Sequence, residues 1–152
     1  MAANTSPIFS DSPNVSNGIW TSSLTANTKS DGTGTIGTDM VLVFTANATD
    51  GSFVNRIRFT PSASVAATAT TASVIRVYYS TVGSGATART NTFLIAEIAV
   101  PAQTADQTTT ATNFYEIPLG FGMPAGSFLH FSMHHAAAAN TSWQATCFGG
   151  NY

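Results

Sequence analysis

The sequence predicts an all-β fold: a single-domain antiparallel β-sandwich of about eight strands, jelly-roll-like in arrangement. Three observations lead to this prediction. Short runs alternate apolar with polar residues, loops rich in Gly, Pro, Ser, Thr and Asn separate these runs, and no segment carries a convincing helical period. A chain of 152 residues is the usual size of one domain. We assign residues 19–152 to the sandwich and residues 1–18 to an extended N-terminal arm.

The predicted arm is rich in Asn, Ser and Pro, which favour turns over long regular strands. It offers only Ile8, Phe9 and Val15 as apolar anchors. These residues are too few to join a core, so we expect the arm to pack on a partner or in an outer groove.

The first strands are predicted from β-branched and aromatic runs separated by turn signals. Residues 19–29 form one candidate strand, and the run MVLVFTA at residues 40–46 is a stronger one. The Asp-Gly pair at residues 50–51 favours a tight hairpin turn into a third strand at residues 53–62.

Alternation along the third run places Phe53, Ile57 and Phe59 on one face and turns Arg56 and Arg58 to the other. Two outward arginines could bind a carboxylate or a phosphate of a partner. They could equally be solvated strand charges that discourage pairing at a sheet edge.

The run at residues 73–81 alternates Ile75 and Val77 with Arg76 and Tyr78, so both of its faces carry bulk. We expect this strand to lie centrally in its sheet, or to present its second face to another subunit.

The next run, FLIAEIAVP, is predicted to bury Leu94, Ala96, Ile98 and Val100 and to turn Glu97 outward. It is followed by a loop without apolar content.

The densest run of large apolar residues lies at residues 113–135, which we interpret as two strands joined by a turn at residues 120–126. A last strand is predicted at residues 142–150. In the paired strands, the residues expected to face the core are Tyr115, Ile117, Leu119, Leu129, Phe131 and Met133.

The chain carries little charge. Charged residues make up 8% of it, against roughly 25% in typical soluble proteins. The net charge is −2 and the five Lys and Arg residues are scattered, so we expect no binding of nucleic acid. A neutral surface rich in hydroxyl groups is compatible with burial against neighbouring subunits.

No long apolar run or secretory signal is visible, so we expect synthesis in the cytoplasm and no contact with a membrane. The single cysteine, Cys147, excludes an intrachain disulfide and is expected to be a small core residue.

Three motifs that could indicate chemistry are weak. The G-x-G-x-x-G spacing at residues 32–37 precedes a β-run instead of a helix, so it predicts no nucleotide site. His130 and His134 share a strand face about 13 Å apart, too far to bind one metal ion unless subunits bring copies together. Neither a paired carboxylate site nor a serine elbow is apparent, so we expect no catalysis and no cofactor.

Several segments together resemble a family of small virion structural proteins of tailed phages and prophages. They are MAANTSPIF, IWTSSLTANTKSDGTGT, GSFVNRIRF, MPAGSFLHFSM and WQATCFGGNY. The family shares an arm, a "TANT..DGTGT" segment, a "G..V.RIR" strand, an "LPAG" turn and a "W.....GG.Y" end. Residues 119–123 and the His-rich run after Phe131 depart from this wording. The resemblance implies a virion structural protein with a β-sandwich or jelly-roll fold, and no catalytic residues.

From these features we expect a capsid decoration or cement protein that sits on the outer head surface of a virion and bridges subunits of the major capsid protein. A homotrimer at threefold positions is the expected assembly, although a dimer would also serve. The candidate partner contacts are Ile8, Phe9, Arg56, Arg58, Tyr78, His130 and His134.

The alternative is a receptor-binding or carbohydrate-binding module of a phage tail or head fibre. Such a site needs exposed aromatic platforms beside polar groups. The candidates are Trp20, Tyr78, Tyr79, Tyr115 and Trp143.

Overall fold

The computed structural model describes residues 10–65, 68–106, 108 and 113–152, and every regular element among them is a β-strand. The all-β prediction is therefore confirmed. The long strands are β1 Ser12–Thr21, β3 Val41–Thr45, β4 Ser52–Ala63, β6 Ser73–Ser80, β8 Thr92–Val100, β10 Tyr115–Met123, β11 Phe128–Met133 and β12 Thr141–Asn151. The two-residue strands are β2 Gly34–Thr35, β5 Thr68–Ala69, β7 Ala86–Thr87 and β9 Thr104–Ala105.

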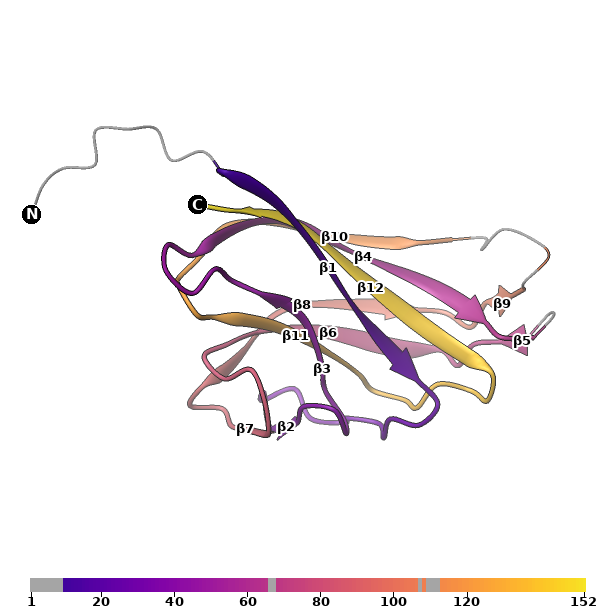
Figure 1. Cartoon of the computed structure of the whole chain (residues 1–152). Helices are drawn as coiled ribbons and strands as arrows, with labels where there is room; N and C mark the ends of the chain where they lie inside the picture. Colours follow the sequence, from indigo (N-terminus) through magenta and orange to yellow (C-terminus); the bar gives the residue numbers. More distant parts are fainter. Residues whose placement is uncertain (1–9, 66–67, 107, 109–112) are drawn as a thin grey trace, which may run out of the picture.

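The long strands form two four-stranded sheets that pack face to face (Figure 1). One sheet, which we call the β4 sheet, has the order β1-β12-β4-β10. The other, the β6 sheet, has the order β3-β11-β6-β8. Neighbouring strands in both sheets pair antiparallel, in agreement with the predicted β-sandwich.

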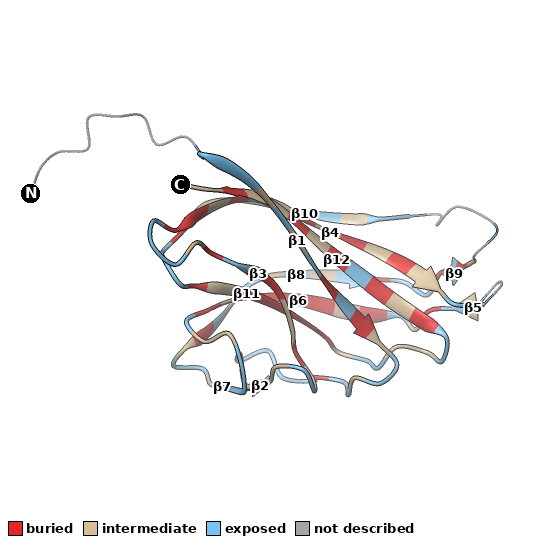
Figure 2. Cartoon of the chain, in the orientation of Figure 1, coloured by how far each residue is buried: buried red, intermediate tan, exposed pale blue. Residues whose placement is uncertain are grey.

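The core lies between the two sheets, and buried residues from both sheets meet there (Figure 2). Phe131 of β11 is at its centre. The ring of Phe131 lies 5.5 Å from that of Phe59 in an edge-to-face contact and 6.1 Å from that of Trp20. The predicted core positions Leu129, Phe131 and Met133 are at most 1% exposed, as expected.

The two arginines of β4 point outward as predicted, but its apolar residues follow the predicted alternation only in part. Ile57 and Phe59 face the core, but Val54 takes the third core position, and Phe53 is half-buried outside the core cluster. The reason is a bulge opposite β12, where Phe148 pairs with Arg56 while the next residue of β12 pairs with Val54. One extra residue in β4 reverses the faces of the residues before it.

Strand β6 is central in its sheet, as its sequence predicts, and its second face is covered by the chain's own loop between β1 and β2. The Nη1 atom of Arg76 donates to the carbonyls of Asn27 (3.2 Å) and Lys29 (3.4 Å). The hydroxyl of Tyr78 donates to the Lys29 carbonyl at 3.1 Å. Strands β2 and β7 pair beyond the β6 sheet, on the side away from the β4 sheet (Figure 1). We call these segments the covering layer.

A second bulge changes the predicted faces of β8. Val77 of β6 pairs with Ala96, but Tyr78 pairs with Leu94, so Ile95 is the extra residue. Leu94 therefore shares the outer face with Tyr78, and the prediction that it faces the core is wrong. The other predicted core positions of this strand hold: Ala96 and Ile98 pack against the core, and Val100 is 2% exposed.

The boundary predicted for the arm is also wrong in part. Residues 12–18, assigned to the arm, belong to β1, which pairs with β12 along its whole length. Residues 22–29, predicted as strand, belong to the covering layer. The pairing of β1 depends on β12, which is more than 100 positions away along the chain, so local turn signals do not reveal it. Ile8 and Phe9 lie outside the described residues.

The turn predicted at residues 120–126 is shorter in the structure. Strand β10 continues to Met123, with a bulge between Pro118 and Phe121 where Gly120 has φ of 63°. The tight connection to β11 is at residues 124–127, and Gly126 there has φ of 68°. Glycine permits this left-handed backbone, so one glycine serves the bulge and the other the turn.

Candidate interaction surfaces

His130, predicted as an exposed contact residue, is wholly buried. Its Nε2 atom donates to the Val82 carbonyl at 2.7 Å, and its ring stacks on Phe128 at 6.3 Å. Its Nδ1 atom is buried without a hydrogen-bond partner among the described residues. Burial lowers the pKa of His130 below the ordinary value of 6.5. His130 belongs to the interior because the loop after β6 covers the outer face of β11.

Tyr78, the second predicted contact on this sheet, is also 0% exposed. Its hydroxyl lies 3.1 Å from the Lys29 carbonyl and accepts from the Ser132 hydroxyl at 3.3 Å. Burial raises the pKa of the Tyr78 phenol. The covering layer buries Tyr78 and the loop after β6 buries His130, so the outer faces of β6 and β11 become a second interior.

His134 is half-buried and lies against His135, with their ring centroids 4.8 Å apart. Its backbone NH donates to the carbonyl of Val74, and the next backbone NH donates to the Ser73 hydroxyl. The pair thus closes the end of β11 where the strand leaves the sheet. Within the described residues, no three His, Cys, Asp or Glu side chains lie so that they could hold a metal ion.

The two carboxylates predicted within strands are both held by arginines. Glu97 accepts from Nε of Arg76 at 2.7 Å across the β6–β8 pair. Glu116 of β10 accepts from Nε of Arg58 at 2.7 Å, and its same oxygen lies 3.3 Å from Nε of Arg56. These contacts are cross-strand ion pairs, which makes each carboxylate part of a sheet face.

Arg56 and Arg58 form a cluster with aromatic residues on the outer face of the β4 sheet. The guanidinium carbon of Arg56 lies 4.5 Å from the Phe148 ring centroid, and that of Arg58 lies 4.4 Å from the Phe114 ring centroid. With Glu116 between them, two cations and one anion leave one net positive charge. We call these five residues the arginine cluster. Stacking and ion pairing fix the direction of both guanidinium groups, which remain more than a third exposed.

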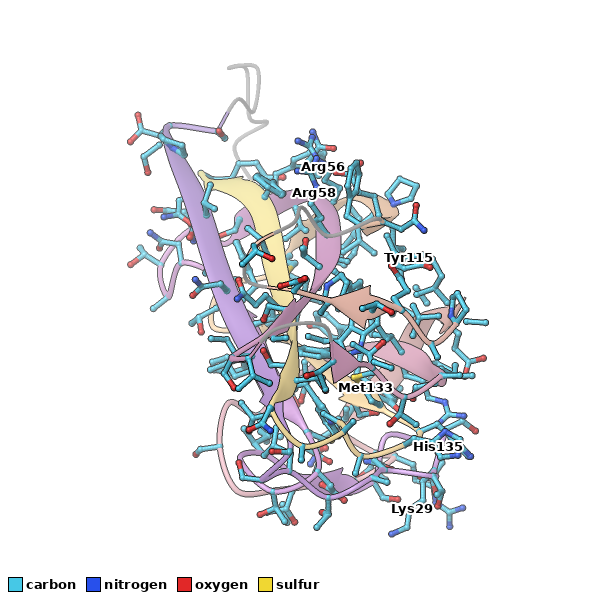
Figure 3. The ribbon with its side chains drawn as sticks, turned by 90° about the vertical axis from the view of Figure 1, so that its right-hand side faces the viewer. Lys29, Arg56, Arg58, Tyr115, Met133 and His135 are labelled. Carbon is cyan, nitrogen blue, oxygen red and sulfur yellow. The ribbon has the colours of Figure 1, made fainter. Side chains whose placement is uncertain are left out.

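No segment among the described residues covers the outer face of the β4 sheet. Large apolar side chains are exposed on it: Phe114 of the arginine cluster at 56%, and Val15 and Ile19 of β1 at 61% and 50%. We call the surface formed by Val15, Ile19 and the arginine cluster the open face. Arg56 and Arg58 lie on the opposite side of the molecule from Lys29, which belongs to the covering layer (Figure 3). The two outer faces of the sandwich therefore differ: loops of the chain cover one, and no described segment covers the other.

A groove of about 450 Å³ runs between β8 and β10, at one edge of the sandwich. Phe93 is 47% exposed and Ile95 is 39% exposed at this edge. We call it the edge groove, and the residues that line it are Tyr79, Phe93, Ile95, Ala96, Pro118, Leu119 and Phe121. Sequence reasoning missed it, because alternation alone does not show that β8 and β10 are both edge strands.

At the opposite edge of the sandwich, β1 and β3 are in direct contact beside a smaller hollow of about 230 Å³. The Ser16 hydroxyl donates to the Val43 carbonyl at 2.9 Å, and a Cβ atom at Gly18 would lie only 2.6 Å from a methyl carbon of Val41. The sheets are therefore in direct contact at one edge and leave apolar side chains in solvent at the other.

Cys147 lies in the core at 0% exposure, as expected for a small core residue. Burial raises the pKa of its thiol to about 12, so the thiolate that would act as a nucleophile is not formed near neutral pH. The described residues include no helix with the length and apolar character needed to cross a membrane.

No protein-family model matches the chain, and no curated protein matches it. Among solved structures, the chain is similar to one titled "Cyanophage Pam1 capsid asymmetric unit". The two are 18% identical, the match covers 99% of this chain and 94% of that chain, and the TM-score is 0.35.

Proposed function

We propose that this protein is a capsid decoration or cement protein, which attaches to the outer surface of a phage head and bridges subunits of the major capsid protein. The observation that carries the proposal is the contrast between the two outer faces of the sandwich. One is buried by the covering layer, whereas the open face presents apolar side chains around oriented arginines. Such a surface suits attachment to another protein, because apolar area and arginine are both enriched at interfaces.

The fold supports the proposal through its topology. When the eight long strands are numbered in chain order, the sheet orders are 1-8-3-6 and 2-7-4-5. Two antiparallel sheets of this kind are typical of the jelly roll, which occurs in viral capsid proteins and in lectins. We therefore include the jelly roll in the proposal. A homotrimer seated at threefold positions of the shell is the corresponding assembly.

The composition supports the same role. Attachment to a shell requires charges on the contact surface to lose water, which is costly unless they are paired. On the open face, Glu116 already pairs with both arginines, and the chain as a whole is only 8% charged. Many copies on one shell can reinforce it even where each contact is weak.

The carbohydrate-binding alternative loses most of its predicted platform. Trp20 and Tyr78 are 0% exposed and Trp143 is 1% exposed. Tyr79 and Tyr115 are only partly exposed and pack against the core. A sugar ring needs an accessible aromatic face, whereas the rings of these side chains pack in or against the core.

The test is binding of the purified protein to capsids that lack it. We expect the wild-type protein to bind and to raise the temperature at which the shells open. The double variant Val15→Asp and Ile19→Asp places two charges on the open face, so we expect it to fold normally and to bind at least tenfold more weakly. Val65→Asp is the matched control, because Val65 is 43% exposed and belongs to the segment after β4, not to the residues that form the open face. Equal binding by all three proteins would refute the assignment of the open face, and no binding by any would refute the decoration role.

A further inference from the structure

The edge groove presents an apolar surface beside two sheet edges. Strand β8 ends the order of the β6 sheet and β10 ends that of the β4 sheet, so each has a side that no described strand pairs with. None of the residues that line the groove is charged. Its floor is continuous with the core, because Tyr79, Leu119 and Phe121 pack against the core cluster.

Native proteins usually protect such an edge with charged residues, prolines or a covering segment. Strand β10 carries such a proline, Pro118, beside its bulge, so its free edge is protected in part. Strand β8 contains no proline, and its one charged residue, Glu97, pairs with Arg76 on the outer face. Phe93 and Ile95 remain exposed in the groove. An extended segment with bulky apolar side chains would cover them and could pair with a free strand edge.

The chain itself contains a segment of this chemistry outside the described residues. Residues 1–9, MAANTSPIF, carry no charged side chain and end in the adjacent apolar residues Ile8 and Phe9. When extended, nine residues span about 30 Å. This length is ample for a strand-like segment that lies along one edge of a sandwich.

Ile8 and Phe9 cannot reach the groove of their own chain. The backbone NH of Asp11 donates to the Asn151 carbonyl, and Ser10 packs on Gly150 of β12. The length of the chain alone limits the Cα atoms of Phe9 and Ile8 to at most about 4 Å and about 7 Å from that of Ser10. Strand β10 lies two strand spacings away, about 10 Å, and the groove is on its far side. The groove of a second copy has no such restriction.

We propose that the edge groove takes up residues 1–9 of a second copy of this chain, with Ile8 and Phe9 packed against Phe93 and Ile95. Arm and groove are different surfaces, so the contact is head-to-tail, and a head-to-tail contact that closes on itself forms a ring such as a trimer. This inference does not depend on the decoration role, because it concerns contacts between copies of this chain alone.

The experiment measures the molar mass of the full chain in solution by light scattering, over a hundredfold range of concentration. We expect the wild-type protein to form a closed oligomer. The arm variant Ile8→Asp with Phe9→Asp and the groove variant Phe93→Asp are both expected to be monomers. Circular dichroism spectra and melting temperatures close to wild type would show that both variants fold, and Val65→Asp is the control that keeps the oligomer.

Mixing the two variants gives the sharpest result. The groove variant retains an intact arm and the arm variant retains an intact groove, so an equal mixture has one functional contact and is expected to stop at a one-to-one dimer. A mixture that stays monomeric, or an oligomer that survives in either variant, would overturn the proposal. A monomeric wild-type protein whose groove variant loses binding to capsids would overturn it as well, since the occupant would then belong to the shell.

Discussion

Acid should destabilise the folded chain through His130, and a single substitution can isolate this effect. The side chain is 0% exposed, its Nε2 donates to the Val82 carbonyl, and its Nδ1 has no partner among the described residues. A proton added to Nδ1 would place a charge in the interior with nothing to compensate it. Burial accordingly lowers the pKa of His130 in the folded state.

The direction of the pH effect follows from linkage. Above pH 6.5, the ordinary pKa of histidine, both the folded and the unfolded chain hold His130 neutral, and the stability is complete. Below it, the unfolded chain binds a proton that the folded chain does not, so the free energy of unfolding falls as the pH falls. The loss is at most about 1.4 kcal/mol for each pH unit until the folded pKa is reached, and it then stops.

The assay compares the wild-type protein with His130→Gln by urea unfolding from about pH 8 to about pH 5. Glutamine can still donate to the Val82 carbonyl but does not titrate in this range. Both proteins keep His134, His135 and every carboxylate, so the difference between the two free energies of unfolding isolates His130. As the pH falls below 6.5, we expect the free energy of unfolding of the wild-type protein to fall more than that of the variant. Two parallel curves would refute the reasoning.

Three further predictions concern the core and the open face. Phe131→Ala removes the ring that contacts aromatic residues of both β1 and β4. We expect urea unfolding to show that the free energy of unfolding falls by about 3–5 kcal/mol, and a fall of less than about 1 kcal/mol would contradict the central place of Phe131 in the core. Because burial raises the thiol pKa to about 12, Cys147 should react with a thiol reagent only after denaturation, and rapid labelling of the folded protein would argue against its burial. Arg58→Ala or Glu116→Gln breaks an ion pair that is about a third exposed, so each should cost roughly 1 kcal/mol or less in thermal or urea unfolding; a cost above 2 kcal/mol would mean that the pair holds the sheet together.

Much of the fold follows from local pattern. The alternation in β11 identified Leu129, Phe131 and Met133 as core residues, and the bulk on both faces of β6 indicated a central strand. Both inferences depend on the two-residue period of a strand, which is a property of the chain at each position. Bulges in β4 and β8 break this period, and for that reason the faces predicted for Phe53 and Leu94 are wrong.

The candidate sites were less predictable from sequence. Arg56 and Arg58 point outward as their alternation predicts, but their pairing with Glu116 depends on the register between β4 and β10. His130 also alternates with core residues, yet it is buried, because a loop from another part of the chain lies over it. A polar residue on the second face of a strand is exposed only if nothing else covers that face.

The sequence by itself determined the β class, the antiparallel sandwich, the low content of charged residues and most of the core, because these features depend on composition and on local period. Only the tertiary structure decided which sheet face is covered, at which edge the sheets are in direct contact and where the chain leaves apolar side chains in solvent. Those outcomes depend on pairings such as β1 with β12 and on loops that cross a whole sheet. Contacts between residues far apart in the chain are set by the packing of the complete domain, and no local pattern contains them.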